Sequence, residues 1–508
     1  MTIHLTILIF WPLVLALLGT LAPGRSAALF ALVGALIPLV YAVIMLFDYD
    51  TARGGLQYVT DDAWIGELGI RYKLGVDGLN LWLVGLAALL FFASAVWVAL
   101  RPPPRAKLFA LHFAIGETAV LGALLAQDLA LFVLFFDLML VPFYFLVGIW
   151  GGPGRVAAAV KMVVYTLVGS LLMLAAAAAT AVLAARGPAD LSFAFSDLAQ
   201  NPLPESTQKW IFVAFALAFL IKMPAFPFHG WMPDAYGSMP LPALAVFSGV
   251  VSKVAVYGFL RIALPLFPQP VHDWQTIFLI LSLLSILYGS IQAFTQTNAR
   301  LILGYSSVAQ LGFITLGVFA LDPAGSGANG ALLQAVNHGL VVAPLFLIIV
   351  LLAERAGGSE DIRDMGGIAF RAPVLATMFL IATFATLAMP GSANFVGEFL
   401  ILLGTFKTKL AIALIASVGV VLASVYALRL YIRAMHNRTG PGVVSVEMQA
   451  TDALVIVPLV LVIVAFALYP QQALRHGQGA VRAAVRPALA AGTQQAAAAQ
   501  TASSGVTP

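Results

Sequence analysis

The sequence predicts an all-α polytopic membrane protein, and three observations lead to this fold class. Of its 508 residues, 61% are hydrophobic and 9% are charged, and the mean hydropathy is +0.99. This composition matches no class of soluble globular protein. The apolar residues also gather in runs of about twenty, the length at which a helix crosses the hydrocarbon core of a bilayer. Because there are about fourteen such runs, we expect about 14 transmembrane helices and little chain outside the membrane.

The first three helices are expected at about 3–22, 27–47 and 78–100. The first run lacks a basic flank and a small-residue cleavage site, so it is predicted to be a retained helix and not a signal peptide. A turn-rich loop between the second and third helices carries five acidic residues, namely Asp48, Asp50, Asp61, Asp62 and Glu67. The segment Arg101–Arg105 (RPPPR) ends the third helix, because consecutive prolines cannot continue one.

Two groups of five helices and one last helix complete the predicted set. They are expected at about 107–125, 128–150, 156–185, 208–236 and 240–264, then at 274–296, 299–320, 327–354, 373–408 and 410–434, and finally at 452–470. The corresponding units are an N-terminal part (1–103), a first five-helix repeat (104–265), a second repeat (272–436), helix 14 (450–471) and a polar, Ala-rich tail (472–508). The tail has no evident apolar stripe, so we expect it to be disordered or a loose surface helix.

The distribution of basic residues predicts the orientation. Half of the 26 Lys and Arg residues fall in loops on one side, namely Arg25, Arg101, Arg105, Lys107, Arg155, Lys161, Arg300, Arg355, Arg363, Arg371, Arg429, Arg433 and Arg438. Basic loops stay in the cytoplasm, so both termini are expected on the non-cytoplasmic side of a bacterial inner membrane. The net charge of +4 follows from this topology and gives no indication of nucleic-acid binding. With no Cys, the chain has no thiolate for a disulfide or an iron–sulfur cluster.

The fourth helix of each five-helix group is interrupted at a matching place. The interruptions are Met223–Phe228 (MPAFPF) and Met389–Phe395 (MPGSANF). Proline removes a helical hydrogen bond, and broken backbone at membrane depth is tolerated only where protein or a water-filled cavity surrounds it. Paired breaks predict two inverted five-helix repeats, with helices 7 and 12 broken and a transport site near the bilayer midplane.

Isolated charges accompany these breaks. Lys222 precedes the first break and Glu398 follows the second, while Lys253 stands alone in the next helix after the first break. Ionisable groups at such depth cost several kcal/mol unless they are paired or hydrated, so they indicate a pathway for charge. Lys407 and Lys409 are different, because a lysine near a helix end usually extends to the interface.

Several motifs together resemble the antiporter-like membrane subunits of respiratory complex I. They are Asp137–Gly152 (DLMLVPFYFLVGIWGG), Phe226–Ala235 (FPFHGWMPDA), Ser252–Arg261 (SKVAVYGFLR), Gly304–Gly312 (GYSSVAQLG), Asn337–Gly339 (NHG), Asp361–Gly367 (DIRDMGG) and Asn394–Phe399 (NFVGEF), within a region from about Leu74 to Arg438. The M-type subunits are the most similar, because Glu398 stands where N-type subunits carry lysine. L-type subunits continue into a long lateral helix, for which this chain is too short.

The resemblance implies a proton-translocating membrane-arm subunit of an NADH:quinone oxidoreductase and assigns roles to five residues. Asp137 and Lys222 would form an ion pair that opens and closes, Lys253 and His338 a central relay, and Glu398 the terminal group toward the exit side. Asp137 departs from the family, which usually has glutamate there. The shorter side chain leaves three readings open: the helices approach more closely, a water bridges the pair, or pumping through this subunit is weakened.

Five further polar residues are secondary candidates: Glu117, Asp128, Lys161, His229 and Asp234. Glu117 is a membrane carboxylate outside the family pattern, and it either compensates for the short Asp137 or is satisfied by a local partner. Lys161 either tunes the region of Asp137 or anchors its helix at the surface. His229 beside the first break is more often a structural hydrogen-bonding group than a relay, and Asp234 is expected to cap a helix or pair locally.

The resemblance places the redox chemistry outside this chain. NADH, FMN, iron–sulfur clusters and quinone are expected in partner subunits, with no cofactor and no metal here. The expected partners are the other membrane-arm subunits, including the L-type and N-type subunits, and the lipid bilayer, without nucleic acid. Two alternatives stay open: a subunit of a multisubunit cation/proton antiporter or membrane-bound hydrogenase, and a non-conducting structural spacer of the arm.

Overall fold

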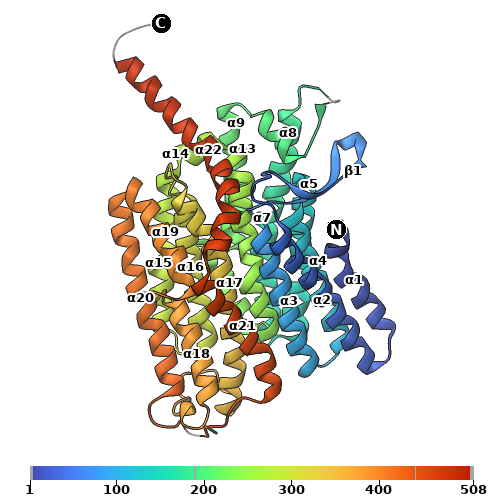
Figure 1. Cartoon of the computed structure of the whole chain (residues 1–508), viewed down its shortest axis with the longest axis vertical. Helices are drawn as coiled ribbons and strands as arrows, with labels where there is room; N and C mark the ends of the chain where they lie inside the picture. The colour runs from blue at the N-terminus through green and yellow to red at the C-terminus, as the bar shows by residue number, and fades with distance from the viewer. Residues whose placement is uncertain (1–3, 188–189, 441, 504–508) are drawn as a thin grey trace.

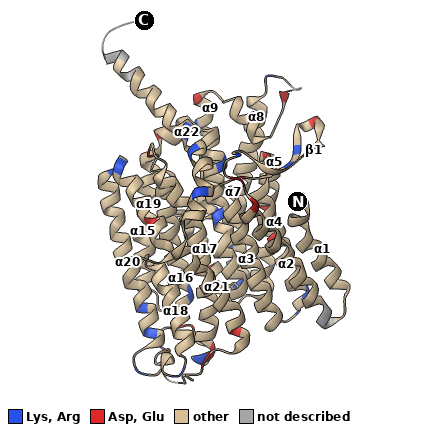
Figure 2. Ribbon diagram, in the orientation of Figure 1, with Lys and Arg blue, Asp and Glu red and all other residues tan. Residues whose placement is uncertain are grey.

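The computed structural model describes residues 4–187, 190–440 and 442–503 as a bundle of long, roughly parallel helices (Figure 1). A β-hairpin, the start of α9 and the far end of α22 lie at the end of the bundle that is uppermost in Figure 1. The loops that follow α17 and α20 lie at the opposite end. Charged residues gather toward the two ends, and a few lie inside the bundle (Figure 2).

The N-terminal part contains three helices and the hairpin. Its elements are α1 (Leu5–Leu21), α2 (Gly24–Asp48), β1 (Gln57–Ile65), η1 (Gly66–Leu68), β2 (Ile70–Val76) and α3 (Leu81–Leu100). The predicted acidic loop is therefore partly an antiparallel ribbon, with Thr60 opposite Leu74. Gly69 takes a positive φ of 65° where the chain turns back, a conformation that glycine adopts without steric cost.

The first five-helix group is more segmented than the sequence suggested. Its elements are α4 (Ala106–Leu125), α5 (Leu129–Leu138), α6 (Leu140–Trp150), α7 (Arg155–Ala184), α8 (Phe195–Gln200), α9 (Glu205–Lys222), η3 (Phe228–Trp231), α10 (Met232–Ser238), α11 (Leu241–Val246), η4 (Phe247–Val251), α12 (Ser252–Gly258), η5 (Phe259–Ala263), α13 (Leu264–Leu266) and α14 (Pro268–Asp273). The helix expected at 128–150 is divided at Met139. Pro142 accounts for this division, because it has no N–H to donate to the carbonyl of Leu138.

The second group and the last predicted helix follow the predicted bounds closely, and a further helix comes after them. Their elements are α15 (Gln275–Thr295), α16 (Ala299–Val318), α17 (Ser326–Arg355), η6 (Ile368–Phe370), α18 (Pro373–Thr386), α19 (Ala393–Thr408), α20 (Leu410–Met435), α21 (Ala450–Leu468) and α22 (Gln471–Ser503). The loop after α17 is tied to the start of α16 by Ile362, whose N–H donates to the Thr297 carbonyl at 2.8 Å. In the same loop, hydrogen bonds from the Arg363 side chain hold the pKa of Asp361 at about 2.

Eleven helices of the described chain are long and apolar enough, by length and composition, to cross a membrane. The segment Leu241–Leu266, α16 and α17 are buried on nearly all sides and form the centre of the bundle. In contrast, α20 and α21 expose much of their apolar surface. Helices that are apolar all round are typical of a core or of a membrane environment. The mostly helical membrane fold is confirmed, whereas fourteen spans and two inverted repeats stay predictions.

The expectation for the C-terminal tail is partly wrong. Residues 471–503 form the long helix α22, which packs along α13, α14 and α17. Val481, Val485 and Ala488 are buried at spacings of four and three residues, so they form the apolar stripe that the sequence analysis did not find. The stripe is hard to detect because alanines supply much of it. His476 also links α22 to α3, because it accepts a hydrogen bond from the Trp82 indole at 3.2 Å.

Candidate functional site

The first helix break exposes backbone groups in the interior and satisfies them locally. At the end of α9, the N–H of Met223 donates to the Phe219 carbonyl and that of Ala225 to the Leu220 carbonyl, both at 3.0 Å. The Trp231 indole donates to the Ile221 carbonyl at 3.0 Å, which replaces a hydrogen bond that the break removes. The chain can therefore stop at Lys222 inside the bundle without leaving these carbonyls unpaired.

The second break repeats this backbone pattern. After α18, the N–H of Leu387 donates to the Thr383 carbonyl at 3.1 Å and that of Met389 to the Phe384 carbonyl at 3.2 Å. These bonds span four and five residues, the same separations as at the first break. The next helix, α19, starts at Ala393 and carries Glu398 on its second turn. The two breaks predicted from proline are thus alike in their hydrogen bonding.

Asp137 and Lys222 lie on neighbouring elements but are not in contact. Lys222 is 4% exposed, and its Nζ donates to the Phe136 carbonyl at 3.3 Å and lies 4.8 Å from the centre of the Phe136 ring. Asp137 stands next to the division between α5 and α6, and its Oδ1 is buried without a hydrogen-bond partner. Within the described residues, no basic nitrogen lies within 4.0 Å of the Asp137 carboxylate. The pair therefore has an open geometry in this structure.

Lys253 is fully buried in the most irregular helix of the bundle. Its Nζ donates to the Ser248 carbonyl and to the Ser252 hydroxyl, the latter at 3.3 Å, and no described carboxylate pairs with it. Two π-helical segments, Phe247–Val251 and Phe259–Ala263, flank the short α12 on which it stands. Such segments are rare and are frequent at functional sites. The π-helical turn at Ser248 supplies a backbone carbonyl to the ammonium group.

Glu398 is hydrogen-bonded by side chains of α16 and α17, and His338 lies on the same face of α17. The imidazole of His338 is 4% exposed, its Nδ1 has no hydrogen-bond partner, and it interacts electrostatically with Lys253. Gln334 lies four residues before His338, so both project from the same face of α17. Glu398 Oε1 accepts hydrogen bonds from Gln310 at 2.9 Å and from Gln334 at 3.2 Å, while Oε2 is buried without a partner.

The secondary candidates separate into distinct environments. Asp128 caps α5, accepting hydrogen bonds from the N–H groups of Ala130 and Leu131 at 3.0 and 3.1 Å. Lys161 and Asp234 form an ion pair at 2.7 Å in which both side chains are about half exposed. A pair of this kind contributes little to stability. The ring centre of His229 lies 4.8 Å from that of Tyr288, and its Nδ1 has no partner.

Glu117 lies buried inside the bundle. It is 1% exposed on α4, its Oε1 has no partner, and no hydrogen bond or ion pair joins it to any described residue. The described residues thus offer Glu117 no local partner, and its compensation for the short Asp137 stays a prediction. Sequence reasoning also missed Gln310 and Gln334, because an uncharged amide in an apolar helix gives a weaker signal than a charge.

Comparisons with known proteins agree with this arrangement. The family model described as NADH:quinone oxidoreductase/Mrp antiporter, TM matches residues 126–423, which contain both breaks and the residues from Asp137 to Glu398. The NADH-quinone oxidoreductase subunit M of Rhodobacter capsulatus is 35% identical over 460 residues, covering 88% of each chain. The chain belongs to the subunit M family of NADH-quinone oxidoreductases. The Escherichia coli K12 subunit M is 34% identical over 429 residues, covering 83% of this chain and 84% of the relative.

Solved structures support the same membership. A chain of respiratory complex I from Thermus thermophilus with bound NADH has a TM-score of 0.87 and 30% identity, covering 95% of this chain and 99% of its own. A chain of the Mrp complex from a Dietzia species has a TM-score of 0.84 at 21% identity, covering 96% and 98%, which shows a shared fold alone. The family recognised from the sequence motifs is confirmed, and the chain is a multi-pass membrane subunit of this enzyme family.

Proposed function

We propose that this M-type subunit conducts protons across the membrane through Asp137, Lys222, Lys253, His338 and Glu398, driven by quinone reduction in partner subunits. The observation that carries the proposal is the series of buried ionisable groups in the bundle, two of which, Lys222 and Glu398, stand beside the paired helix breaks. Four of the five side chains are at most 4% exposed, the exception being Asp137. Buried ionisable groups of this kind in membrane helices mark ion pathways and proton relays.

The second half of the proposed path is supported by hydrogen bonds at Glu398. Gln334, on the face of α17 that carries His338, donates to Glu398 Oε1. A proton that leaves Lys253 would be accepted by the His338 ring. The free Oε2 of Glu398 is the open acceptor at the end of this sequence. Histidine suits the intermediate step because its ordinary pKa is about 6.5.

The first half of the path requires water. No hydrogen bond joins Lys222 to Lys253 among the described residues, and phenylalanines, including Phe136, Phe219 and Phe259, pack near these helices. A water molecule in such surroundings needs polar partners. The free Asp137 Oδ1 and the Phe136 carbonyl, which already contacts Lys222, provide two of them. We infer that closing of the Asp137–Lys222 pair and hydration of this region alternate during turnover.

The proposed function also implies an orientation in the membrane and a set of neighbouring subunits. Protons enter from the cytoplasm, both termini lie on the non-cytoplasmic side of a bacterial inner membrane, and L-type and N-type subunits are neighbours in the arm. NADH, FMN, iron–sulfur clusters and quinone belong to other subunits, and this chain contributes no redox site. The orientation is supported by the loops rich in Lys and Arg, because such loops stay on the cytoplasmic side.

Substitution of the relay residues tests the function. We expect Lys222→Ala, Lys253→Ala and Glu398→Ala each to lower NADH-driven proton uptake by inverted membranes at least fivefold when normalised to assembled complex. Lys161→Ala and Asp234→Ala are the matched controls, since they remove charges from the exposed ion pair, and they should change uptake by less than a factor of two. Equal and small effects of all five substitutions would contradict the relay and favour a structural spacer.

Purification of the tagged chain from native membranes distinguishes the complex I subunit from a subunit of a cation/proton antiporter. Iron–sulfur subunits and NADH:quinone reductase activity in the eluate are expected. A complex without redox subunits that shows sodium-dependent proton exchange without NADH would instead indicate a cation/proton antiporter.

A further inference from the structure

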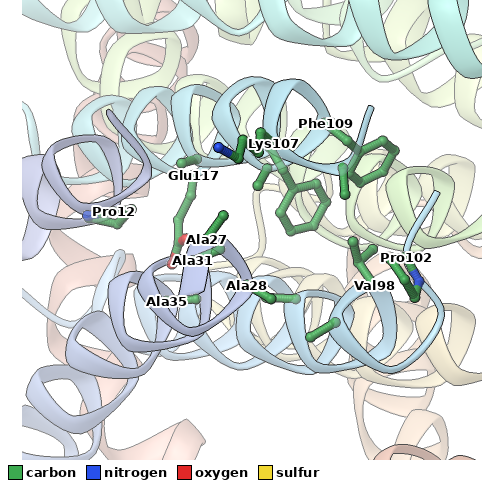
Figure 3. A pocket seen from close by; sticks show the side chains of 16 residues that line it. Pro12, Ala27, Ala28, Ala31, Ala35, Val98, Pro102, Lys107, Phe109 and Glu117 are labelled. Atoms are coloured by element: carbon green, nitrogen blue, oxygen red, sulfur yellow. The ribbon is translucent and has the colours of Figure 1, made fainter. Parts of the chain in front are cut away.

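A cavity of about 330 Å³ lies among α1, α2, α3 and α4, apart from the residues of the proposed proton path (Figure 3). Its sixteen lining residues are apolar except for Lys107 and Glu117. Alanines dominate, and Ala27, Ala31 and Ala35 lie four residues apart on one face of α2. The volume is at the lower end of the range of ligand pockets, which is about 300–1,000 Å³.

The cavity extends from one membrane boundary toward the middle of the membrane. On α4 its lining runs from Ala106, at the start of the helix, to Glu117. Eleven residues of α-helix span about 16 Å, which is roughly half of the approximately 30 Å hydrocarbon core. Pro102 lies beside the outer end, in the loop that joins α3 to α4. The carboxyl group therefore stands at the deep end of a narrow apolar space.

Glu117 makes no hydrogen bond and no ion pair with any residue whose side chain the structure describes. Its side chain points from α4 across the cavity toward α2 (Figure 3), and its Oε1 makes no hydrogen bond. Lys107, the one cation among the described lining residues, is held elsewhere, because its Nζ donates to the Thr20 and Ala22 carbonyls at the end of α1. An ionised carboxylate in apolar surroundings is strongly disfavoured without a partner. The carboxyl is thus either neutral or paired with a cation that enters the cavity.

We propose that this cavity binds a lipophilic primary amine, with the amine nitrogen at Glu117 and the alkyl part along the alanines of α2. An amine is complementary to both forms of the carboxyl group. A neutral amine accepts the O–H proton on its lone pair, which yields an ammonium–carboxylate pair with no other reactant. An alcohol can only share a hydrogen bond, and a lipid acyl chain leaves the carboxyl unpaired.

The walls of the cavity favour the same ligand. Phe109 and Phe113 lie on α4 with nearly parallel rings, whose centres are 6.0 Å apart. Aromatic faces attract ammonium groups and also pack well against alkyl chains. Since Lys107 stands near the outer end, its positive charge favours entry of the neutral amine over the protonated one. The site contains no residue of the proposed proton path, so the inference is independent of that function.

Photolabelling of the intact complex in native membranes tests the site. The probe is a ten-carbon primary amine with an aliphatic diazirine in its chain, and labelled peptides are located by mass spectrometry. We expect labels on α2 and α4, at least tenfold better competition by decylamine than by decanol, and at least fivefold less labelling in Glu117→Gln. Glu67→Gln is the control, since it removes an exposed carboxylate outside the membrane helices and should leave labelling unchanged.

A second variant keeps the carboxyl group and removes the space. Ala31→Phe fills the cavity beside Glu117, so labelling of α2 and α4 should fall at least fivefold in assembled complex. This variant decides the question if Glu117→Gln does not assemble. The proposal is overturned by an absence of label on α2 and α4 in the unaltered protein. It is also overturned if decanol competes as well as decylamine, since the cavity would then accept any apolar chain.

Discussion

Lengthening Asp137 to glutamate is the most direct test of the open geometry at the first break. The carboxylate lies more than 4.0 Å from any described basic nitrogen, and Lys222 Nζ donates instead to the Phe136 carbonyl. One added methylene extends the side chain by about 1.5 Å. If this shortens the charge separation from about 5.5 to about 4 Å, the attraction at an effective dielectric of 20 increases by about 1 kcal/mol. That corresponds to roughly a sevenfold shift toward the closed pair.

The assay is the ratio of proton uptake to NADH oxidation in inverted membranes, normalised to assembled complex. We expect Asp137→Glu to keep or raise this ratio, and Asp137→Ala to lower it at least fivefold, because Lys222 then has no carboxylate to close upon. Asp234→Glu is the matched control for the added methylene, since Asp234 is paired at the exposed surface. A clear loss of uptake in Asp137→Glu, with assembly intact, would refute the reasoning and indicate that α5 and α9 are fitted to aspartate.

Three further outcomes are expected. Arg261 donates to Asp77 at 2.5 Å, and both side chains are mostly buried. Removing one partner of a buried pair costs about 3–5 kcal/mol, so Arg261→Ala should reduce the amount of assembled subunit. Wild-type amounts on a blue native gel would contradict this. A stop codon after Thr493 should preserve assembly, whereas one after Pro470 should abolish it by removing the buried face of α22. Arg101 joins Glu354 at 2.5 Å and the buried Asp452 at 2.6 Å, so Arg101→Gln should lower the melting temperature of the complex, measured by differential scanning fluorimetry.

Features that depend on single residues were predicted well. Proline determines the two breaks locally, because any helix must lose a hydrogen bond there, and both breaks are present, at 223–227 and 387–392. The isolated charges were also recognised as buried, since a charge in the middle of a spanning segment is costly against lipid and faces the interior of the bundle. Lys222, Lys253 and Glu398 are all at most 4% exposed.

Features that depend on packing between distant segments were not predicted. The two glutamines that bond Glu398 come from α16 and α17, and nothing in their local sequence distinguishes them from other amides. The π-helical turn before Lys253 contains no proline, whereas Pro265 follows the second turn closely. The division of α5 from α6 was missed for a different reason. Pro142 indicates it locally, but the apolar run at 128–150 has the length of one spanning helix and was predicted as one. Length alone is a poor guide to helix continuity.

The two breaks also place opposite charges at opposite helix ends. Lys222 is the last residue of α9, where the C-terminal end of the helix dipole carries a partial negative charge that favours a cation. Glu398 is the sixth residue of α19, whose N-terminus has a partial positive charge, although this effect weakens beyond the first turn. The backbone therefore supports the lysine more strongly than the glutamate. Glu398 therefore depends on hydrogen bonds from side chains, which Gln310 and Gln334 donate. Lys222 needs no permanent ion pair with Asp137, because the helix end and the Phe136 carbonyl already stabilise its charge.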